Sequence, residues 1–258
     1  MGIISVVSCK YNMGQSVFCI NLSNMLGILS SEKTLLVDTH RYKFSQVDEY
    51  ISNKEINQGL DDFIMRLETE KLNSESFSHC INSANGNMDF MNSNHKKHLN
   101  QRHIEVLFDY FTDYENVVID LKLNNDAVAR KMLEKSDMIF YLIDQNYVHH
   151  KLIDKTICSD GKEVYLVVNK FDEKIKYSMN QIEKNLKKYQ QLEFKKIFSL
   201  PYDERIANYI NDGKAREIIS KKSARNTLYF KALNEMMVLI FKYDKKSKVK
   251  GGFMSWKK

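Results

Sequence analysis

A polar loop near the N-terminus, CKYNMGQS over residues 9–16, has the composition of an anion-binding loop. It follows an apolar, β-branched run and precedes apolar residues spaced three and four apart, which predicts a strand over 1–8 and a helix from Val17. In such a unit the loop amides and the helix N-terminus point at one place, where they can hold a phosphate. An ordinary strand–helix unit without a ligand has the same pattern, so both interpretations stay open at this point.

Two carboxylates end apolar runs further along the chain. Asp38 closes KTLLVD and Asp120 closes NVVID. A carboxylate at the end of a strand can simply cap the next turn. However, ligands of open α/β sheets bind outside the carboxyl ends of the strands. The favoured interpretation is therefore a shared site formed by the loop, Asp38 and Asp120.

Strand and helix patterns alternate along the rest of the chain. Further strands are expected at 33–38, 88–91, 116–120, 138–143, 163–168 and 196–200. Helices are expected at 46–72, 104–111, 128–135, 177–192 and 228–243, with a short helix between the strands at 138–143 and 163–168. This alternation predicts an α/β fold with a doubly wound, mostly parallel sheet and helices on both faces. We expect one domain over 1–243 and a tail over 244–258, with 73–87, rich in Ser and Asn, as the least ordered stretch.

The composition excludes several classes of protein. The 258 residues with 43% hydrophobic content can bury a full core, and no apolar run approaches the length of about eighteen that a membrane span needs. The apolar N-terminus is too short for a signal peptide. The four cysteines are scattered without a CxxC pair, which favours reduced thiols in the cytoplasm and argues against a metal cluster. The net charge of +6 permits an anionic partner without naming one.

Histidines gather in the polar stretch that ends near residue 103. They are His79, His95, His98 and His103. Histidines three apart on a helix can share a metal. No acidic or cysteine partner stands at ligand spacing, so a solvated polar face is the favoured interpretation.

The loop and the helix after it, CKYNMGQSVFCINLS, resemble the deviant Walker A motif of the ParA/MinD ATPases, KGGxGK[ST]. Lys10 matches the first lysine of the motif, Gly14 its third glycine and Ser16 its Mg²⁺-binding hydroxyl. Five further stretches are similar to motifs of this family in the family's order: LLVDTHRYKFS, YENVVIDLKLN, SDMIFYLIDQN, VYLVVNKFDEK and FSLPYDERIANYINDGK. The resemblance covers roughly residues 1–220 and implies a MinD-like P-loop NTPase fold.

The resemblance also implies a set of site residues for ATP or ADP with Mg²⁺. The loop contacts would come from Lys10, Tyr11, Asn12, Met13, Gly14, Gln15, Ser16 and Val17, and the base contacts from Asn169, Pro201, Tyr202 and Asp203. The Mg²⁺ ligands would be Ser16, Asp38 and Asp120, and the catalytic residues Lys10 and Asp38. In this family the counterpart of Lys10 reaches the phosphates of the partner subunit, which implies a face-to-face homodimer. The NKFD at 169–172 also resembles the guanine-reading NKxD of GTPases, but the proline loop at Pro201 favours adenine.

Several positions depart from the family's pattern. Tyr11 and Asn12 replace glycines, Gln15 replaces the P-loop lysine, and His40 stands where a second aspartate helps to place the attacking water. Gln15 can donate a hydrogen bond to a phosphate but brings no charge. Asn tolerates a left-handed backbone, whereas Tyr does so poorly. Because parts for binding survive and parts for hydrolysis are altered, we predict nucleotide binding with weak or no ATP hydrolysis.

In the pilus-positioning branch of the family (TadZ/CpaE-like proteins), Walker residues are often altered. The resemblance to this branch implies a localisation, scaffold or regulatory protein of the pilus or secretion-system positioning type, with an unidentified protein partner. The alternative is an active partition ATPase for plasmids or chromosomes. A third possibility is an interaction module that binds no nucleotide.

The last fifteen residues combine lysines with apolar side chains. The stretch DKKSKVKGGFMSWKK surrounds Phe253, Met254 and Trp256 with lysines. Lysines are attracted to anionic lipid, and Trp and Phe insert at a membrane interface. A membrane-surface contact, peripheral to the inner face of the membrane, and a merely solubilising tail are both open. Contact with DNA is a weaker choice.

Overall fold

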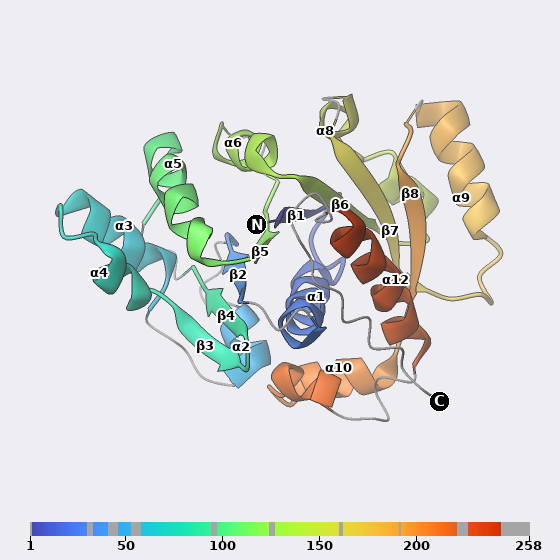
Figure 1. Cartoon of the computed structure of the whole chain (residues 1–258). Helices are drawn as coiled ribbons and strands as arrows, with labels where there is room; N and C mark the ends of the chain where they lie inside the picture. The colour runs from blue at the N-terminus through green and yellow to red at the C-terminus, as the bar shows by residue number, and fades with distance from the viewer. Residues whose placement is uncertain are drawn as a thin grey trace.

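The computed structural model describes residues 2–29, 33–40, 46–52, 58–93, 97–123, 127–159, 162–190, 192–220 and 227–243. Within these residues, eight strands form one sheet in the order β3-β4-β2-β5-β1-β6-β7-β8 (Figure 1). The strands are β1 Gly2–Ser8, β2 Thr34–Asp38, β3 Asn82–Asn85, β4 Met88–Met91, β5 Asn116–Asp120, β6 Met138–Ile143, β7 Glu163–Phe171 and β8 Lys196–Pro201. All neighbouring strands are parallel except β3 and β4, which confirms the predicted mostly parallel sheet. The predicted tail over 244–258 lies outside the described residues.

Helices cover both faces of the sheet, because alternate residues of each buried strand point to opposite sides (Figure 1). Ile4 and Val6 of β1 belong to one apolar cluster, and Ile3 and Val7 to the other. The first cluster is completed by α1 Gln15–Leu29, α2 Gln46–Ser52, α10 Glu204–Asn211 and α12 Leu228–Tyr243. The second is completed by α3 Leu60–Glu68, α4 Ser74–Ser78, α5 Gln101–Tyr110, α6 Ala127–Lys135, α8 Lys155–Ser159 and α9 Met179–Asn185.

Short helical segments complete the described chain. They are α7 Tyr147–His150, 3-10 turns at Phe111–Asp113 and Ala215–Ser220, and a π-helical turn at Leu186–Gln190. None of the described helices is long and apolar enough to cross a membrane.

Three predicted segments differ from the structure. The helical region expected over 46–72 contains two helices, α2 and α3, and ends at Glu68, with 53–57 outside the described residues. The stretch at 73–87 is regular: the Asn73 side chain and Ser76 cap α4 reciprocally, and β3 pairs with β4. The helix expected over 177–192 begins at Met179 and ends in the π-helical turn.

The histidine stretch is only partly a solvated face. His79 and His98 are exposed, and His95 lies outside the described residues. His103 is buried, and its ring Nε2 lies 3.1 Å from Nδ2 of Asn100, the residue that caps α5. The prediction of a solvated face is therefore wrong for His103, whose ring packs against the N-cap residue of α5.

The order of the strands brings the predicted site residues to one edge of the sheet. β1 lies between β5 and β6, so the chain leaves β1 toward β2 on one side and later returns on the other. Such a reversal opens a crevice at the carboxyl ends of the strands, where ligands of doubly wound sheets bind. Asp38 and Asp120 stand opposite each other in the register of β2 and β5, at the ends of both strands.

Candidate functional site

A pocket of about 730 Å³ lies at the carboxyl ends of the central strands. The predicted loop residues, Lys10 through Val17, line one part of it, and Asn169, Pro201, Tyr202 and Asp203 line another. The structure therefore brings together the loop and the residues predicted to contact the base, which lie about 150 to 190 positions further along the sequence. Asp38 and Asp120 are absent from the described lining, whereas Gln15 and His40 are part of it.

The backbone of the loop depends on Gly14. This residue has a φ of 76°, and a Cβ atom there would lie 2.7 Å from Nδ2 of Asn169. Asn169 donates from the same Nδ2 atom to the carbonyl of Met13 at 2.6 Å. Asn169 thus fixes the loop as well as lining the pocket.

The two glycine replacements behave differently. Asn12 has a φ of 63°, in the left-handed region that Asn tolerates, whereas Tyr11 is not among the described residues with a positive φ. The strain expected at Tyr11 is therefore not present in its backbone. The Tyr11 side chain is 53% exposed at the mouth of the pocket.

The side-chain amide of Gln15 points to the end of β5. Its Nε2 donates to Oδ1 of Asp120 at 2.7 Å and lies 2.9 and 3.0 Å from the carbonyls of Val6 and Leu121. Gln15 is buried, at 6% exposure. The predicted hydrogen bond from Gln15 to a phosphate would therefore require this amide to leave Asp120.

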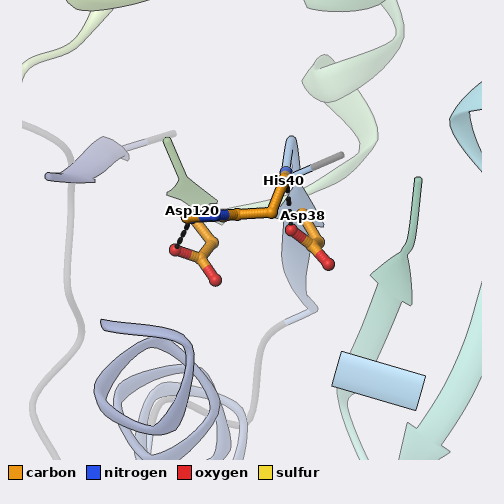
Figure 2. Close-up of side chains that lie close together, drawn as sticks. All are labelled: Asp38, His40 and Asp120. Carbon is orange, nitrogen blue, oxygen red and sulfur yellow. Dashed lines mark hydrogen bonds and ion pairs between the residues drawn. The ribbon is translucent and has the colours of Figure 1, made fainter. Parts of the chain in front are cut away.

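His40 lies between the two carboxylates, as Figure 2 shows. Its ring Nε2 is 3.0 Å from Oδ1 of Asp120, and its backbone amide donates to Oδ1 of Asp38 at 2.8 Å. Burial alone lowers the pKa of His40, but the charge and hydrogen bond of Asp120, with the charge of Asp38, raise that pKa to about 9. At neutral pH the ring is an imidazolium that compensates two buried carboxylates.

Mg²⁺ prefers oxygen ligands and keeps several waters. Asp38, His40 and Asp120 offer ligand atoms within 4.8 Å of one another, and Oδ2 of Asp120 is buried without a hydrogen-bond partner among the described residues. Such an oxygen fits a cation chemically. However, Gln15 and His40 line the pocket and the carboxylates do not. The predicted set of Ser16, Asp38 and Asp120 therefore fits Mg²⁺ in its donor chemistry, provided that His40 moves away from Asp120.

Lys10 lines the pocket and is held by a chain of two further side chains. Its Nζ lies 2.9 Å from Nε2 of His149, and Nδ1 of His149 lies 2.8 Å from Oδ1 of Asp144. Because a lysine ammonium can only donate, Nε2 of His149 accepts and its Nδ1–H donates to Asp144. Sequence reasoning did not find His149 and Asp144, although both follow the predicted strand at 138–143.

The fold is similar to that of several solved structures. A ParA family ATPase from Chlorobium tepidum TLS matches with a TM-score of 0.73 and 17% identity, over 92% of this chain and 97% of the other. A protein assigned to plasmid partition in Borrelia burgdorferi B31, bound to AMPPNP, has a TM-score of 0.69 and 17% identity, over 93% and 98%. The MinD protein of Pyrococcus horikoshii OT3, complexed with Mg-ADP, has a TM-score of 0.68 and 15% identity, over 94% and 98%.

The chain has the fold of the ParA/MinD ATPases. No protein-family model matches its sequence, and a sequence search of curated proteins also finds no match. With identities this low, the likeness lies in the fold. The pocket at the loop after β1 stands at the ligand-binding edge expected for a ParA/MinD fold.

Two lysines of the pocket escaped the sequence-based prediction. Lys122 lines the pocket two positions after Asp120, and Lys170 does so directly after Asn169. Their adjacency to motif residues was the available signal. A single lysine next to a motif residue has no pattern of its own, however, so only the structure shows which lysines reach the pocket.

Proposed function

We propose that this protein binds ATP or ADP in the pocket at the loop after β1. The observation that carries the proposal is that the loop residues 10–17 and the base-side residues Asn169, Pro201, Tyr202 and Asp203 line one pocket. A volume of about 730 Å³ is within the ordinary range for small-ligand and cofactor sites. Support comes from the neighbours of similar fold that hold AMPPNP and Mg-ADP.

The base side of the pocket suits a planar ring. Pro201 ends β8, and Tyr202 after it is 61% exposed. Asp203 caps α10 by accepting from the backbone amide of Arg205 at 3.0 Å. The turn that carries Tyr202 is therefore fixed between the end of β8 and the start of α10. We propose adenine as the base, with Asn169 and the Pro201 turn beside it.

Weak or absent hydrolysis is the second half of the proposal. Phosphoryl transfer depends on positive charge at the phosphates and on a placed nucleophile. Gln15 supplies no charge and is bonded to Asp120, and His40 is bonded to the same carboxylate. When Mg²⁺ binds, it would be held by Ser16, Asp38 and Asp120 after His40 is displaced, and it would supply charge at the phosphates.

Calorimetry with ATP and ADP, with and without Mg²⁺, tests the proposal together with a phosphate-release assay. We expect binding in the micromolar to low millimolar range and turnover close to background. Gly14→Ala should abolish binding, because a Cβ at this position meets Asn169. The matched control is Gly86→Ala, which has a φ of 48° but no atom within 4 Å of the added Cβ. No heat at millimolar nucleotide would disprove the proposal, and ordinary ATPase turnover would disprove its second half.

We further propose a symmetric homodimer with the two pockets facing each other. Lys10 would then leave His149 and reach the phosphates bound by the partner subunit. A stable interface of this kind buries roughly 1,600 Å² or more in total.

Light scattering with and without ATP checks the dimer. Lys10→Ala is expected to reduce the ATP-dependent dimer, because the amine that crosses the interface is lost. Lys151→Ala is a suitable control, since Lys151 is exposed but absent from the described pocket lining. A strict monomer at tens of micromolar under both conditions would make Lys10 an ordinary pocket lysine.

In the cell, a nucleotide-dependent dimer with weak turnover would act as a localisation, scaffold or regulatory factor, of the pilus or secretion-system positioning type. Its partner would be a protein that recognises the dimer. Measurable turnover stimulated by DNA would favour the alternative, an active partition ATPase.

The lysine-rich stretch at 244–258 is proposed to contact anionic lipid, which would place the protein at the inner face of the membrane. Full-length protein is expected to float with anionic liposomes at low salt, and protein truncated after Tyr243 is not. Neutral liposomes are the control. Equal flotation of the two proteins on anionic lipid would leave the stretch as a solubilising tail.

A further inference from the structure

A nucleotide bound in the pocket would need a cation beside its phosphates, and the residue at position 15, Gln15, does not supply one. The phosphates of a nucleotide are held most strongly by charge-assisted hydrogen bonds. Gln15 is neutral and its amide is bonded to Asp120. Three lysines line the described part of the pocket: Lys10, Lys122 and Lys170. Their positions differ, so the structure can distinguish between them.

Lys122 stands beside the loop. It follows β5, which pairs directly with β1 along its length. Its backbone amide donates to Oγ1 of Thr39 at 3.2 Å, and the same hydroxyl donates to the carbonyl of Asp120 at 2.9 Å. The base of the Lys122 side chain is therefore fixed at the ends of β2 and β5, next to the loop after β1.

The two other lysines are placed differently. Lys170 follows Asn169 on the base side, on β7, which β6 separates from β1. Its Nζ lies 3.3 Å from the carbonyl of Asn12. Nζ of Lys10 lies 2.9 Å from Nε2 of His149. In the proposed dimer, Lys10 contacts the phosphates bound by the partner subunit. Lys122 is the lysine on the side of the loop where Asp38, His40 and Asp120 lie.

The aromatic ring of Tyr11 contacts the amine of Lys122. The Nζ atom lies 5.2 Å from the centroid of the Tyr11 ring, within the range of a cation–π contact. Tyr11 belongs to the loop itself and is 53% exposed at the pocket. A glycine at this position would offer no ring for the lysine. The side chain at position 11 therefore gives Lys122 a contact within the loop.

We propose that Lys122, held against the ring of Tyr11, supplies the positive charge that binds the phosphates of the nucleotide in place of a lysine at position 15. The ligand class is a nucleoside di- or triphosphate, recognised through its phosphates. This inference rests on the proposed nucleotide binding and assigns a second cation to the same site.

The competing explanation is an ordinary surface contact between a lysine and an aromatic ring. The structure offers a matched example, because Nζ of Lys135 also lies 5.2 Å from a ring centroid, that of Phe108. Lys135 ends α6, before β6, and is absent from the described pocket lining. Lys135→Gln therefore removes the same kind of contact without touching the pocket.

Calorimetry in EDTA with ATP, adenosine and inorganic tripolyphosphate tests the proposal on the full chain. Lys122→Gln is expected to weaken the binding of ATP and tripolyphosphate by about tenfold or more, because one charge-assisted hydrogen bond is lost. Adenosine affinity should not change, since it has no phosphate. Lys122→Arg should preserve ATP binding, and Lys135→Gln should bind as the wild type does. Tyr11→Leu should weaken ATP binding by a few fold, because the ring that faces Nζ of Lys122 is lost.

The outcomes separate this proposal from the proposed function. If the wild type binds ATP and Lys122→Gln binds it equally well, nucleotide binding stands and the role of Lys122 is wrong. That role is also wrong if Lys122→Gln weakens ATP and adenosine equally, because the loss would not concern phosphates. If the wild type binds neither ATP nor tripolyphosphate, in EDTA or with Mg²⁺, both proposals fail. Thermal unfolding of each variant shows that the fold is intact.

Discussion

His40→Ala is expected to lower the free energy of unfolding by about 3–5 kcal/mol, the usual cost of removing one partner from a buried ion pair. Asp38 and Asp120 are 1% and 0% exposed and stand opposite each other in the sheet. The His40 imidazolium is bonded to Asp120 at 3.0 Å. Without it, the buried carboxylate of Asp120 loses its charged partner, and Gln15 offers it only a neutral amide.

The pH dependence of stability should show the same interaction. Because the pKa of His40 is raised from 6.5 to about 9 in the folded state, its contribution is fully present below pH 6.5 and is lost as the pH rises through about 9. Urea unfolding of the wild type and of His40→Ala in EDTA, between pH 6 and pH 10, measures this difference. The difference in unfolding free energy between the wild type and His40→Ala should become smaller as the pH rises.

His103→Ala is the matched control for this experiment. His103 is also buried, at 5% exposure, but burial lowers its pKa and so disfavours the charged ring. We expect His103→Ala to lower the free energy of unfolding by less, about 1–2 kcal/mol, because only the hydrogen bond at the start of α5 is lost. An equal loss in the two variants, with no dependence on pH for His40→Ala, would show that His40 is an ordinary buried side chain.

The fold was predictable because its strands are nearly continuous apolar runs. NVVID and MIFYLI match β5 and β6 residue for residue. Parallel strands covered on both faces have this signature. The stretch at 73–87 was misjudged because its polar residues form regular structure: the side chains of Asn73 and Ser76 cap α4, and the backbone of Asn82 and Ser83 pairs with β4. Composition alone does not reveal such bonds.

The sequence predicted which residues form the site, but it did not predict the contacts between them. The motifs marked Gln15 and His40 as separate departures, 25 positions apart. In the structure both are bonded to Oδ1 of Asp120, because the register of β2 and β5 brings the chain after Asp38 next to Asp120. Of these two partners of Asp120, His40 is the one that carries positive charge, and Gln15 contributes a neutral amide. A pairing of this kind depends on tertiary structure, which no local pattern encodes.

Replacing both residues, Gln15→Lys with His40→Asp, is expected to raise ATP turnover by about a hundredfold or more over the wild type. Single charged groups at phosphoryl-transfer and oxyanion sites are worth effects of this size. Lysine at position 15 would carry charge to the loop, and aspartate at position 40 would free Oδ1 of Asp120 from His40. The Gln15 amide already lies 2.7 Å from that oxygen, so the new ammonium also compensates Asp120 in the absence of nucleotide.

The single variants decide whether the two positions act together. His40→Asp alone places a third carboxylate beside Asp38 and Asp120 and should be the least stable of the set, whereas the double variant should recover stability through Lys at position 15. Gln15→Lys alone brings a second cation next to the His40 imidazolium and should raise turnover little. We therefore expect strong non-additivity in a double-mutant cycle, in both unfolding free energy and phosphate release. Additive effects, with the double variant at background turnover, would show that the loss of hydrolysis has another origin, and Tyr11 in the loop would be the next residue to change.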